Sequence, residues 1–134
     1  MALAHVGDRW TLLIVNVLLP GPRRFNELSE ELAGIAPNVL TQRLRQLEAD
    51  RLVVAQAYST RPVRFTYELT DTGRALAGAL RMLSHWGAEQ AAMGGEEGVG
   101  AIHQACGTVA EPRWWCRTCD RIVDDDDLAQ LRWV

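Results

Sequence analysis

The sequence has no lysine, only three cysteines and no long apolar run, and the last two shortages each argue against a class of protein. The longest apolar stretch, residues 10–19, is interrupted by Asn16 and is too short for a transmembrane helix, which needs about 18 residues. An odd cysteine count does not suit the disulfide framework of a small secreted protein. No charged segment with a cleavage site precedes the apolar stretch. We therefore expect a globular cytoplasmic protein with no membrane partner.

Catalytic patterns are missing as well. The sequence shows no Ser/His/Asp order, no paired carboxylates and no phosphate-binding loop, so we do not expect an enzyme. The chain does have enough apolar residues to form a core, because 48% of its 134 residues are hydrophobic.

All 14 basic residues are arginine, and the net charge of −3 is unevenly distributed. Residues 1–90 hold ten arginines against nine acidic residues, whereas residues 91–134 hold four arginines against eight. Residues 36–66 are locally basic, with five arginines against two acidic residues. An acidic total therefore does not exclude a nucleic-acid partner, since the basic face of such a protein can be local.

Glycines divide the chain. Four of them fall within residues 94–100, which is typical of a linker or long turn. We expect one domain over residues 1–93 and a small second one over residues 94–134.

The first 50 residues carry helical patterns. Residues 10–19 are apolar on all sides, which predicts a helix buried in a core or a subunit interface. A short helix follows over residues 24–32. A third helix is predicted over residues 37–50, because Leu40, Leu44 and Leu47 form one apolar stripe. The opposite side of that helix is polar and free of acidic residues: Asn38, Thr41, Gln42, Arg45 and Gln46.

A β-hairpin and a long helix come next. Residues 63–69 alternate apolar and polar side chains, the period of a strand, and residues 52–58 form a second strand candidate. Residues 59–62 join the two strands and place Arg61 at or near the tip. Thr70 is a candidate N-cap for a long helix. That helix carries one apolar side: Leu76, Leu80, Leu83 and Trp86.

This order of elements predicts a winged helix-turn-helix, an α+β fold that is mainly helical. In that motif the second helix of the pair enters the major groove of DNA. Asn and Gln can pair with adenine, Arg with guanine, and Thr can touch a thymine methyl. Four arginines are better placed for phosphates: Arg23, Arg24, Arg61 and Arg64. The alternative is that the polar face is only solvated.

Several segments resemble the HxlR-type transcriptional regulators, relatives of the MarR group. The resemblance covers about residues 2–88 and rests on four segments: 7–14 (GDRWTLLI), 21–28 (GPRRFNEL), 34–48 (GIAPNVLTQRLRQLE) and 67–73 (YELTDTG). It implies a homodimer that binds double-stranded DNA at a pseudo-palindromic operator, with the first and the long last helix at the dimer interface. Some members carry a sensing cysteine just before the first helix. Here no cysteine precedes Cys106.

The second domain carries a ligand pattern, H-x2-C-x9-C-x2-C. His103, Cys106, Cys116 and Cys119 suit one tetrahedral Zn²⁺ per chain, so we expect a structural zinc ribbon without catalysis. Such a short tail would depend on the metal for folding. Two alternatives are a redox pair of Cys116 and Cys119 and a chance cluster of thiols. Dimer bracing, partner contact and DNA contact all remain open as roles for the ribbon.

The function expected from these patterns is a DNA-binding transcriptional regulator. Two alternatives belong to other classes: a protein-interaction module of a larger transcription assembly, and a zinc- or redox-responsive switch. A small-molecule effector could bind among Trp10, His85 and Trp86, although core packing also explains those residues.

Overall fold

The computed structural model describes residues 6–95, 101–123 and 127, and the chain divides into two compact units after Leu80. The division falls inside the last long helix, α6 (Ala77–Met93), ahead of the glycine-rich segment. Residues 96–100 of that segment lie outside the described residues. Among the described residues, no helix is both long enough and apolar enough to span a membrane.

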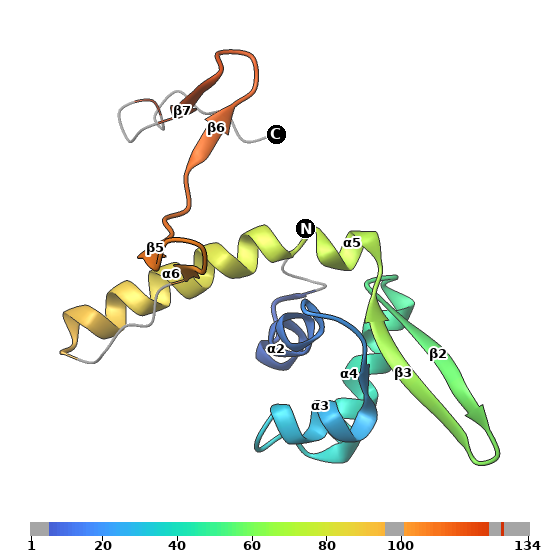
Figure 1. The fold of residues 1–134 in the computed structure, drawn as a ribbon. Coiled ribbons are helices and arrows are strands. Elements are labelled where there is room, and N and C mark those ends of the chain that lie inside the picture. Colours follow the sequence, from blue (N-terminus) through green and yellow to red (C-terminus); the bar gives the residue numbers. More distant parts are fainter. Residues whose placement is uncertain (1–5, 96–100, 124–126, 128–134) are drawn as a thin grey trace. The chain divides into compact units, whose positions relative to one another are not determined.

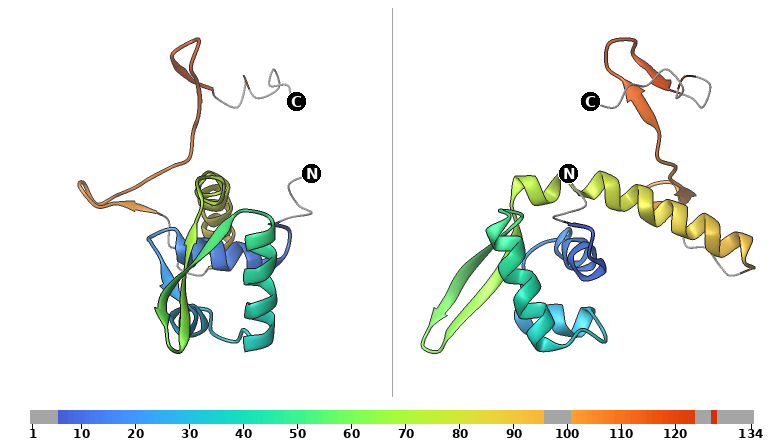
Figure 2. Two further views of the ribbon diagram at one scale, coloured as in Figure 1. Left: turned by 90° about the vertical axis from the view of Figure 1, so that its right-hand side faces the viewer. Right: turned by 180° about the vertical axis from the view of Figure 1, so that it is seen from behind.

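The first unit has the predicted order of a winged helix-turn-helix (Figure 1). Helices α3 and α4 form the pair, and the β2–β3 hairpin, the wing, extends beside them (Figure 2). The elements are α2 (Arg9–Leu18), β1 (Arg23–Arg24), α3 (Phe25–Glu31), α4 (Pro37–Ala49), β2 (Val53–Thr60), β3 (Val63–Leu69), α5 (Asp71–Arg74) and the start of α6.

The strands form one antiparallel sheet in the order β1-β3-β2. Val53 lies opposite Leu69 at the base of the wing, and Thr60 lies opposite Val63 at its tip. The predicted connection over residues 59–62 was too long, because Ser59 and Thr60 continue the strand pairing beyond a bulge after Ala57. Only Arg61 and Pro62 remain between the strands.

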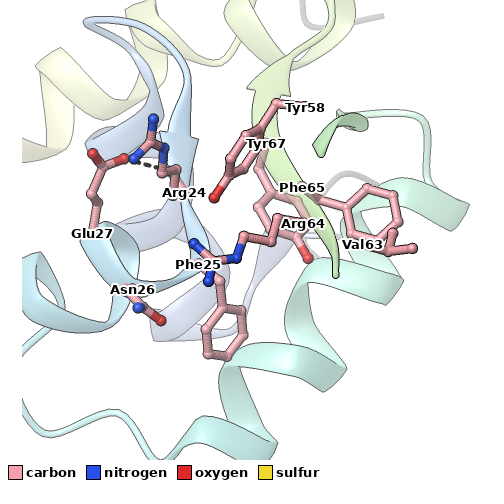
Figure 3. A pocket seen from close by; sticks show the side chains of 9 residues that line it. All are labelled: Arg24, Phe25, Asn26, Glu27, Tyr58, Val63, Arg64, Phe65 and Tyr67. Carbon is pink, nitrogen blue, oxygen red and sulfur yellow. Dashed lines mark hydrogen bonds between the residues drawn. The ribbon is translucent and has the colours of Figure 1, made fainter. Parts of the chain in front are cut away.

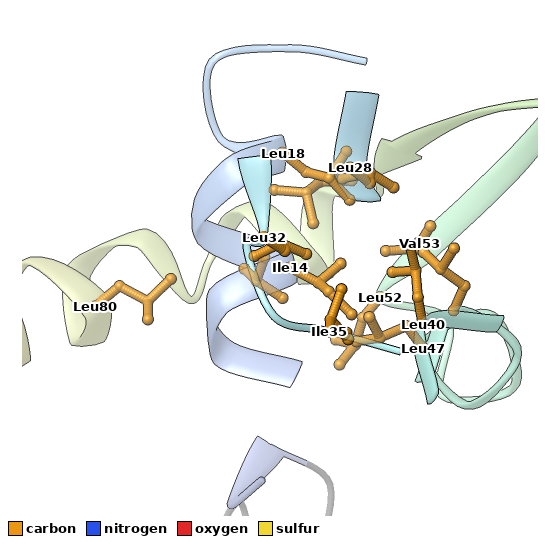
Figure 4. Close-up of a cluster of buried hydrophobic side chains, with 13 residues drawn as sticks. Ile14, Leu18, Leu28, Leu32, Ile35, Leu40, Leu47, Leu52, Val53 and Leu80 are labelled. Atoms are coloured by element: carbon orange, nitrogen blue, oxygen red, sulfur yellow. The ribbon is translucent and has the colours of Figure 1, made fainter. Parts of the chain in front are cut away.

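The core joins helices α2, α3 and α4, both wing strands and the start of α6 (Figure 4). The predicted stripe of Leu40, Leu44 and Leu47 on α4 is confirmed, since each side chain is at most 1% exposed. Helix α2 contributes Ile14 and Leu18 to the same core. Because α4 buries this whole side, its opposite side must face outward.

Helix α2 is buried on one side rather than all round. Ile14, Val15 and Leu18 are fully buried, whereas Leu13 is 41% exposed and Leu12 is half-buried. A second apolar side is therefore left uncovered within one chain.

The predicted long helix after the wing is two helices, α5 and α6. They are separated at Ala75 and Leu76, where the Leu76 N–H bonds to the carbonyl of Gly73 only three residues back, a tighter turn than an α-helix allows. Of the predicted stripe, Leu76 and Leu80 pack on the core. Leu83 and Trp86 are 53% and 61% exposed.

The carbonyl of Leu52 holds the wing to the helices on either side. It accepts a hydrogen bond from the Thr70 N–H at 3.0 Å. The Thr70 hydroxyl donates to the neighbouring Arg51 carbonyl at 2.6 Å and lies 3.3 Å from the Leu52 oxygen. Thr70 also caps α5 as predicted, its hydroxyl accepting from the Gly73 N–H at 3.1 Å. A Cβ at Gly73 would overlap the Leu52 carbonyl oxygen. This position therefore needs glycine for close approach.

We expect Gly73→Ala to lower the free energy of unfolding by roughly 1–3 kcal/mol, because backbone rather than a flexible side chain would have to move. Gly78→Ala is the matched control, since a Cβ there meets nothing within 4 Å and alanine favours a helix by up to about 1 kcal/mol. Urea unfolding of both variants measures the difference. Equal stability of the two would contradict the close contact.

Asp8 connects the start of α2 to α4. Its Oδ1 accepts from the N–H groups of Trp10 at 3.0 Å and Thr11 at 3.3 Å, which caps the helix. Its Oδ2 lies 3.2 Å from the Arg43 guanidinium. The Nε of Arg43 is buried and has no hydrogen-bond partner among the described residues. Asp8 therefore serves as both a cap and an ion-pair partner.

Two substitutions separate these roles. Asp8→Ala removes both and should lower the free energy of unfolding by about 1–2 kcal/mol. Asp8→Asn keeps a capping oxygen and loses only a part-exposed ion pair, so it should cost less than about 1 kcal/mol. The midpoint of urea unfolding gives both values. A loss as large for Asn as for Ala would mean that the ion pair dominates.

The second unit contains two short hairpins besides most of α6. The first pairs β4 (Ile102–His103) with β5 (Thr108–Val109), and the second pairs β6 (Trp114–Cys116) with β7 (Arg121–Val123). No residue from 101 to 123, here called the tail, is buried.

Candidate nucleic-acid interface

The exposed side of α4 gathers the five polar residues predicted to read DNA. Asn38, Thr41, Gln42, Arg45 and Gln46 line one surface hollow of about 460 Å³, and we call this set the reading face. Their shared position follows from the burial of the leucine stripe on the other side of the helix. Amide, hydroxyl and guanidinium groups are the ones that pair with base edges in the major groove.

Hydrogen bonds within α4 distinguish the members of the reading face. The Thr41 hydroxyl donates to the Pro37 carbonyl at 2.8 Å. The Gln46 amide donates to the Asp50 carboxylate at 3.2 Å, which keeps it beside a negative charge. Asn38, Gln42 and Arg45 have exposed side chains without such intrahelical bonds among the described residues. These three are the best placed to contact bases.

The four predicted phosphate-binding arginines differ in their surroundings. The Arg23 Nε lies 2.8 Å from Glu31, and its guanidinium also donates to the Pro22 carbonyl at 3.1 Å, so this side chain has a structural role. The Arg24 guanidinium lies 4.8 Å from the centre of the Tyr58 ring. Arg61 and Arg64 are exposed, on the turn and on strand β3 of the wing.

A second hollow lies between the start of α3 and the wing, again about 460 Å³ (Figure 3). Arg24 and Arg64 reach it from opposite sides, and three aromatic residues, Tyr58, Phe65 and Tyr67, line it from the wing. The sequence pattern predicts these aromatics only as strand residues. The signal for the hollow is the alternation of aromatic residues with Arg64 along an exposed hairpin.

Tyr67 lies between this hollow and α4. Burial raises the pKa of its phenol, and the nearby Glu48 carboxylate adds to the increase, while Arg45 opposes it. The phenol therefore remains a hydrogen-bond donor at neutral pH.

The four candidate metal ligands lie in two separate pairs. The His103 Nδ1 is 3.3 Å from the Cys106 Sγ in the first hairpin. In the second hairpin, the thiols of Cys116 and Cys119 hydrogen-bond to each other, and this bond raises the pKa of Cys119. A hydrogen bond from the Cys119 N–H holds the pKa of Cys116 below its ordinary value. A hydrogen bond with Thr108 likewise lowers the pKa of Cys106. Within the described residues, no three metal-binding side chains lie together.

The candidate effector residues fall in different units. Trp10 is half-buried and stacks under the Arg9 guanidinium at 4.3 Å. His85 lies 3.4 Å from Glu89 on α6, and Trp86 is exposed. An effector site among them stays a prediction.

The fold and the reading face define a winged helix-turn-helix DNA-binding protein. A family model described as HxlR-like helix-turn-helix matches residues 5–94. The chain belongs to this family, and it is a DNA-binding transcriptional regulator, as the sequence predicted.

Relatives support this assignment. An uncharacterised HTH-type transcriptional regulator of Mycobacterium tuberculosis is 40% identical over 118 residues, 88% of this chain and 74% of that protein. The regulator YodB of Bacillus subtilis is 36% identical over 85 residues, 63% of this chain and 76% of YodB. A match of 118 residues is longer than residues 5–94, so the mycobacterial similarity extends beyond the winged-helix unit.

Similar solved structures support the same family assignment. The reduced form of Bacillus subtilis YodB superposes with a TM-score of 0.57 at 36% identity, covering 63% of this chain and 83% of that one. A MarR-family regulator from Enterococcus faecalis gives a TM-score of 0.60 at 39% identity, covering 70% and 86%.

Substitutions should separate base contacts from phosphate contacts. We expect Gln42→Ala and Arg45→Ala to relax sequence specificity, each at a cost of about 1–3 kcal/mol on the preferred site. Arg61→Ala should weaken binding to all sequences and reduce the slope of log affinity against log salt by about 1. Fluorescence anisotropy at several salt concentrations, on specific and unrelated DNA, measures both effects.

Arg51→Gly is the charge-matched control. Arg51 follows the end of α4 remote from Asn38 and has φ 59°, a conformation that suits glycine. This variant should lose one arginine without changing specificity. A specificity change there as large as that of Arg45→Ala would argue against the reading face.

Proposed function

We propose that this regulator acts as a homodimer that reads a pseudo-palindromic operator, with α4 in the major groove and the wing against the neighbouring backbone or minor groove. The observation that carries the proposal is the reading face itself. It presents five hydrogen-bonding side chains, and no acidic residue lines its hollow. The wing adds two exposed arginines, Arg61 and Arg64.

Charge supports this orientation. The chain is acidic overall, but residues 36–66, which include α4 and most of the wing, hold five arginines against two acidic residues. One of the two, Asp50, is occupied by Gln46 at the far end of α4. A polyanion approaching the N-terminal half of α4 therefore meets polar and positive groups.

The second hollow fits the DNA backbone. Guanidinium groups form forked, charge-assisted hydrogen bonds with phosphate, and Arg24 and Arg64 both reach into this space. Tyr58 fixes the Arg24 guanidinium through its ring, which lowers the entropy cost of holding that side chain for a phosphate.

Dimerisation is supported by apolar side chains that one chain leaves uncovered. Leu13 on α2 is 41% exposed, and Leu83 and Trp86 on α6 are 53% and 61% exposed. Aromatic and aliphatic side chains of this size are typical of the buried centre of an interface. Two copies would then place their α4 helices about 34–36 Å apart, one turn of DNA.

Selection of bound DNA from a random pool tests the proposal. We expect an inverted repeat whose half-site centres are about 10–10.5 base pairs apart, bound by two chains in sedimentation analysis. Leu83→Asp should shift the protein to monomers and weaken operator binding at least tenfold, because a carboxylate would be buried at the interface.

Ser84→Asp is the matched control, since it adds the same charge about 100° around the helix from Leu83. It should leave the dimer intact. Selection that returns no preferred sequence, together with co-purification of a larger transcription assembly, would instead favour a protein-interaction module.

A further inference from the structure

The first hairpin of the tail is shaped around a ligand pair. His103 ends strand β4, and its carbonyl accepts from the N–H groups of Cys106 at 3.2 Å and Gly107 at 2.8 Å. This tight turn brings the His103 Nδ1 to 3.3 Å from the Cys106 sulfur. Gly107 has φ +70° and directs the chain into β5.

The second hairpin repeats this arrangement. Cys116 ends strand β6, Cys119 follows three residues later, and the next residue, Asp120, has φ 51° before β7 begins. The left-handed conformation costs a non-glycine residue about 1–2 kcal/mol. Both turns therefore share one plan: a ligand at the strand end, a second ligand after two residues, then a left-handed residue.

The tail has no core to hold these hairpins. From residue 101 to 122 only Cys116 is less than exposed, and Ile102, Val109, Trp115 and Ile122 are 54–60% exposed. Strands of two or three residues form hairpins that are marginal by themselves in water. A unit this small needs a disulfide, a metal or a partner for stability.

We propose that one Zn²⁺ per chain, bound by His103, Cys106, Cys116 and Cys119, joins the two hairpins into a structural metal site. Three thiolates and one imidazole satisfy a tetrahedral zinc ion and leave no open position for substrate or water. Each hairpin holds half of the ligand set, and only four residues, 110–113, separate β5 from β6. The ion supplies the attraction that brings the halves together.

A disulfide explains the tail less well. All three cysteines are free thiols. Pairing Cys116 with Cys119 would close only the second turn and would leave the His103–Cys106 turn without a role. One zinc site uses all four residues. This metal site goes beyond the proposed operator binding, because zinc binding does not depend on DNA binding.

Metal analysis of the full-length purified chain is the first test. We expect one zinc per chain after dialysis against metal-free buffer. Cys106→Ser and Cys119→Ser, one variant in each hairpin, should each lose most of the metal. His85→Gln is the matched control, because His85 lies on α6 outside both hairpins, and it should retain one zinc. Absence of zinc, or full zinc in either cysteine variant, would overturn the proposal.

Cobalt replacement and hydrogen exchange test the metal site in the unaltered chain. Misfolding of a cysteine variant therefore cannot account for the result. The Co²⁺ form of the unaltered chain should show the visible absorption of a tetrahedral thiolate site; an octahedral spectrum would contradict the ligand set. Removing zinc with a chelator should speed amide exchange in residues 102–123 at least ~10-fold, while the core of α2 and α4, which contains none of the ligands, stays protected. Unchanged exchange in the tail would show that the metal has no structural role.

Discussion

The carbonyl oxygen of Leu52 is the point on which the geometry of the winged-helix unit depends. It accepts a hydrogen bond from the Thr70 N–H, and Gly73 packs against it closely enough to exclude a side chain. The Thr70 hydroxyl bonds to the adjacent Arg51 carbonyl. The end of α4, the base of both wing strands and the start of α5 therefore meet at one backbone group. A recognition helix and a wing can contact neighbouring grooves only if their relative position is fixed, and this junction fixes it.

The arginines of the chain are divided between ion pairs that stabilise the fold and exposed positions. Arginine supplies every cation of the chain, so each positive group is a planar fork suited to phosphate and guanine. Three of these arginines in the winged-helix unit form ion pairs that serve the fold, however. Arg43 pairs with Asp8, Arg23 with Glu31 and Arg74 with Glu68, and each pair connects different segments of that unit. An arginine count alone therefore overstates the surface available to DNA.

Local periodicity was enough to predict the fold class and the reading face, because the leucine stripe of α4 fixes which residues face outward. It could not predict contacts between residues distant in sequence. The pairing of Asp8 with Arg43, the engagement of Arg23, and the break at Leu76 all depend on tertiary neighbours. The wing turn was predicted too long because Ser59 and Thr60 have ordinary turn chemistry but pair across the strands. The spacing of His103, Cys106, Cys116 and Cys119 was enough to mark them as candidate zinc ligands, whereas the matching of the two turns needed backbone angles.

The length of the wing determines how far along the DNA the contacts of one chain can extend. Strand β2 has eight residues, which at about 3.3 Å per residue span roughly 25 Å. Half a turn of B-form DNA is only about 17 Å. Arg61 therefore lies about that far from the Leu52 junction at which α4 ends. In the proposed complex it faces a minor groove next to the major groove that receives α4. Arginine in a minor groove responds to its width, which is narrow in A-tracts. In the proposed complex, the affinity would therefore depend on the stiffness and shape of flanking base pairs that no side chain of α4 touches.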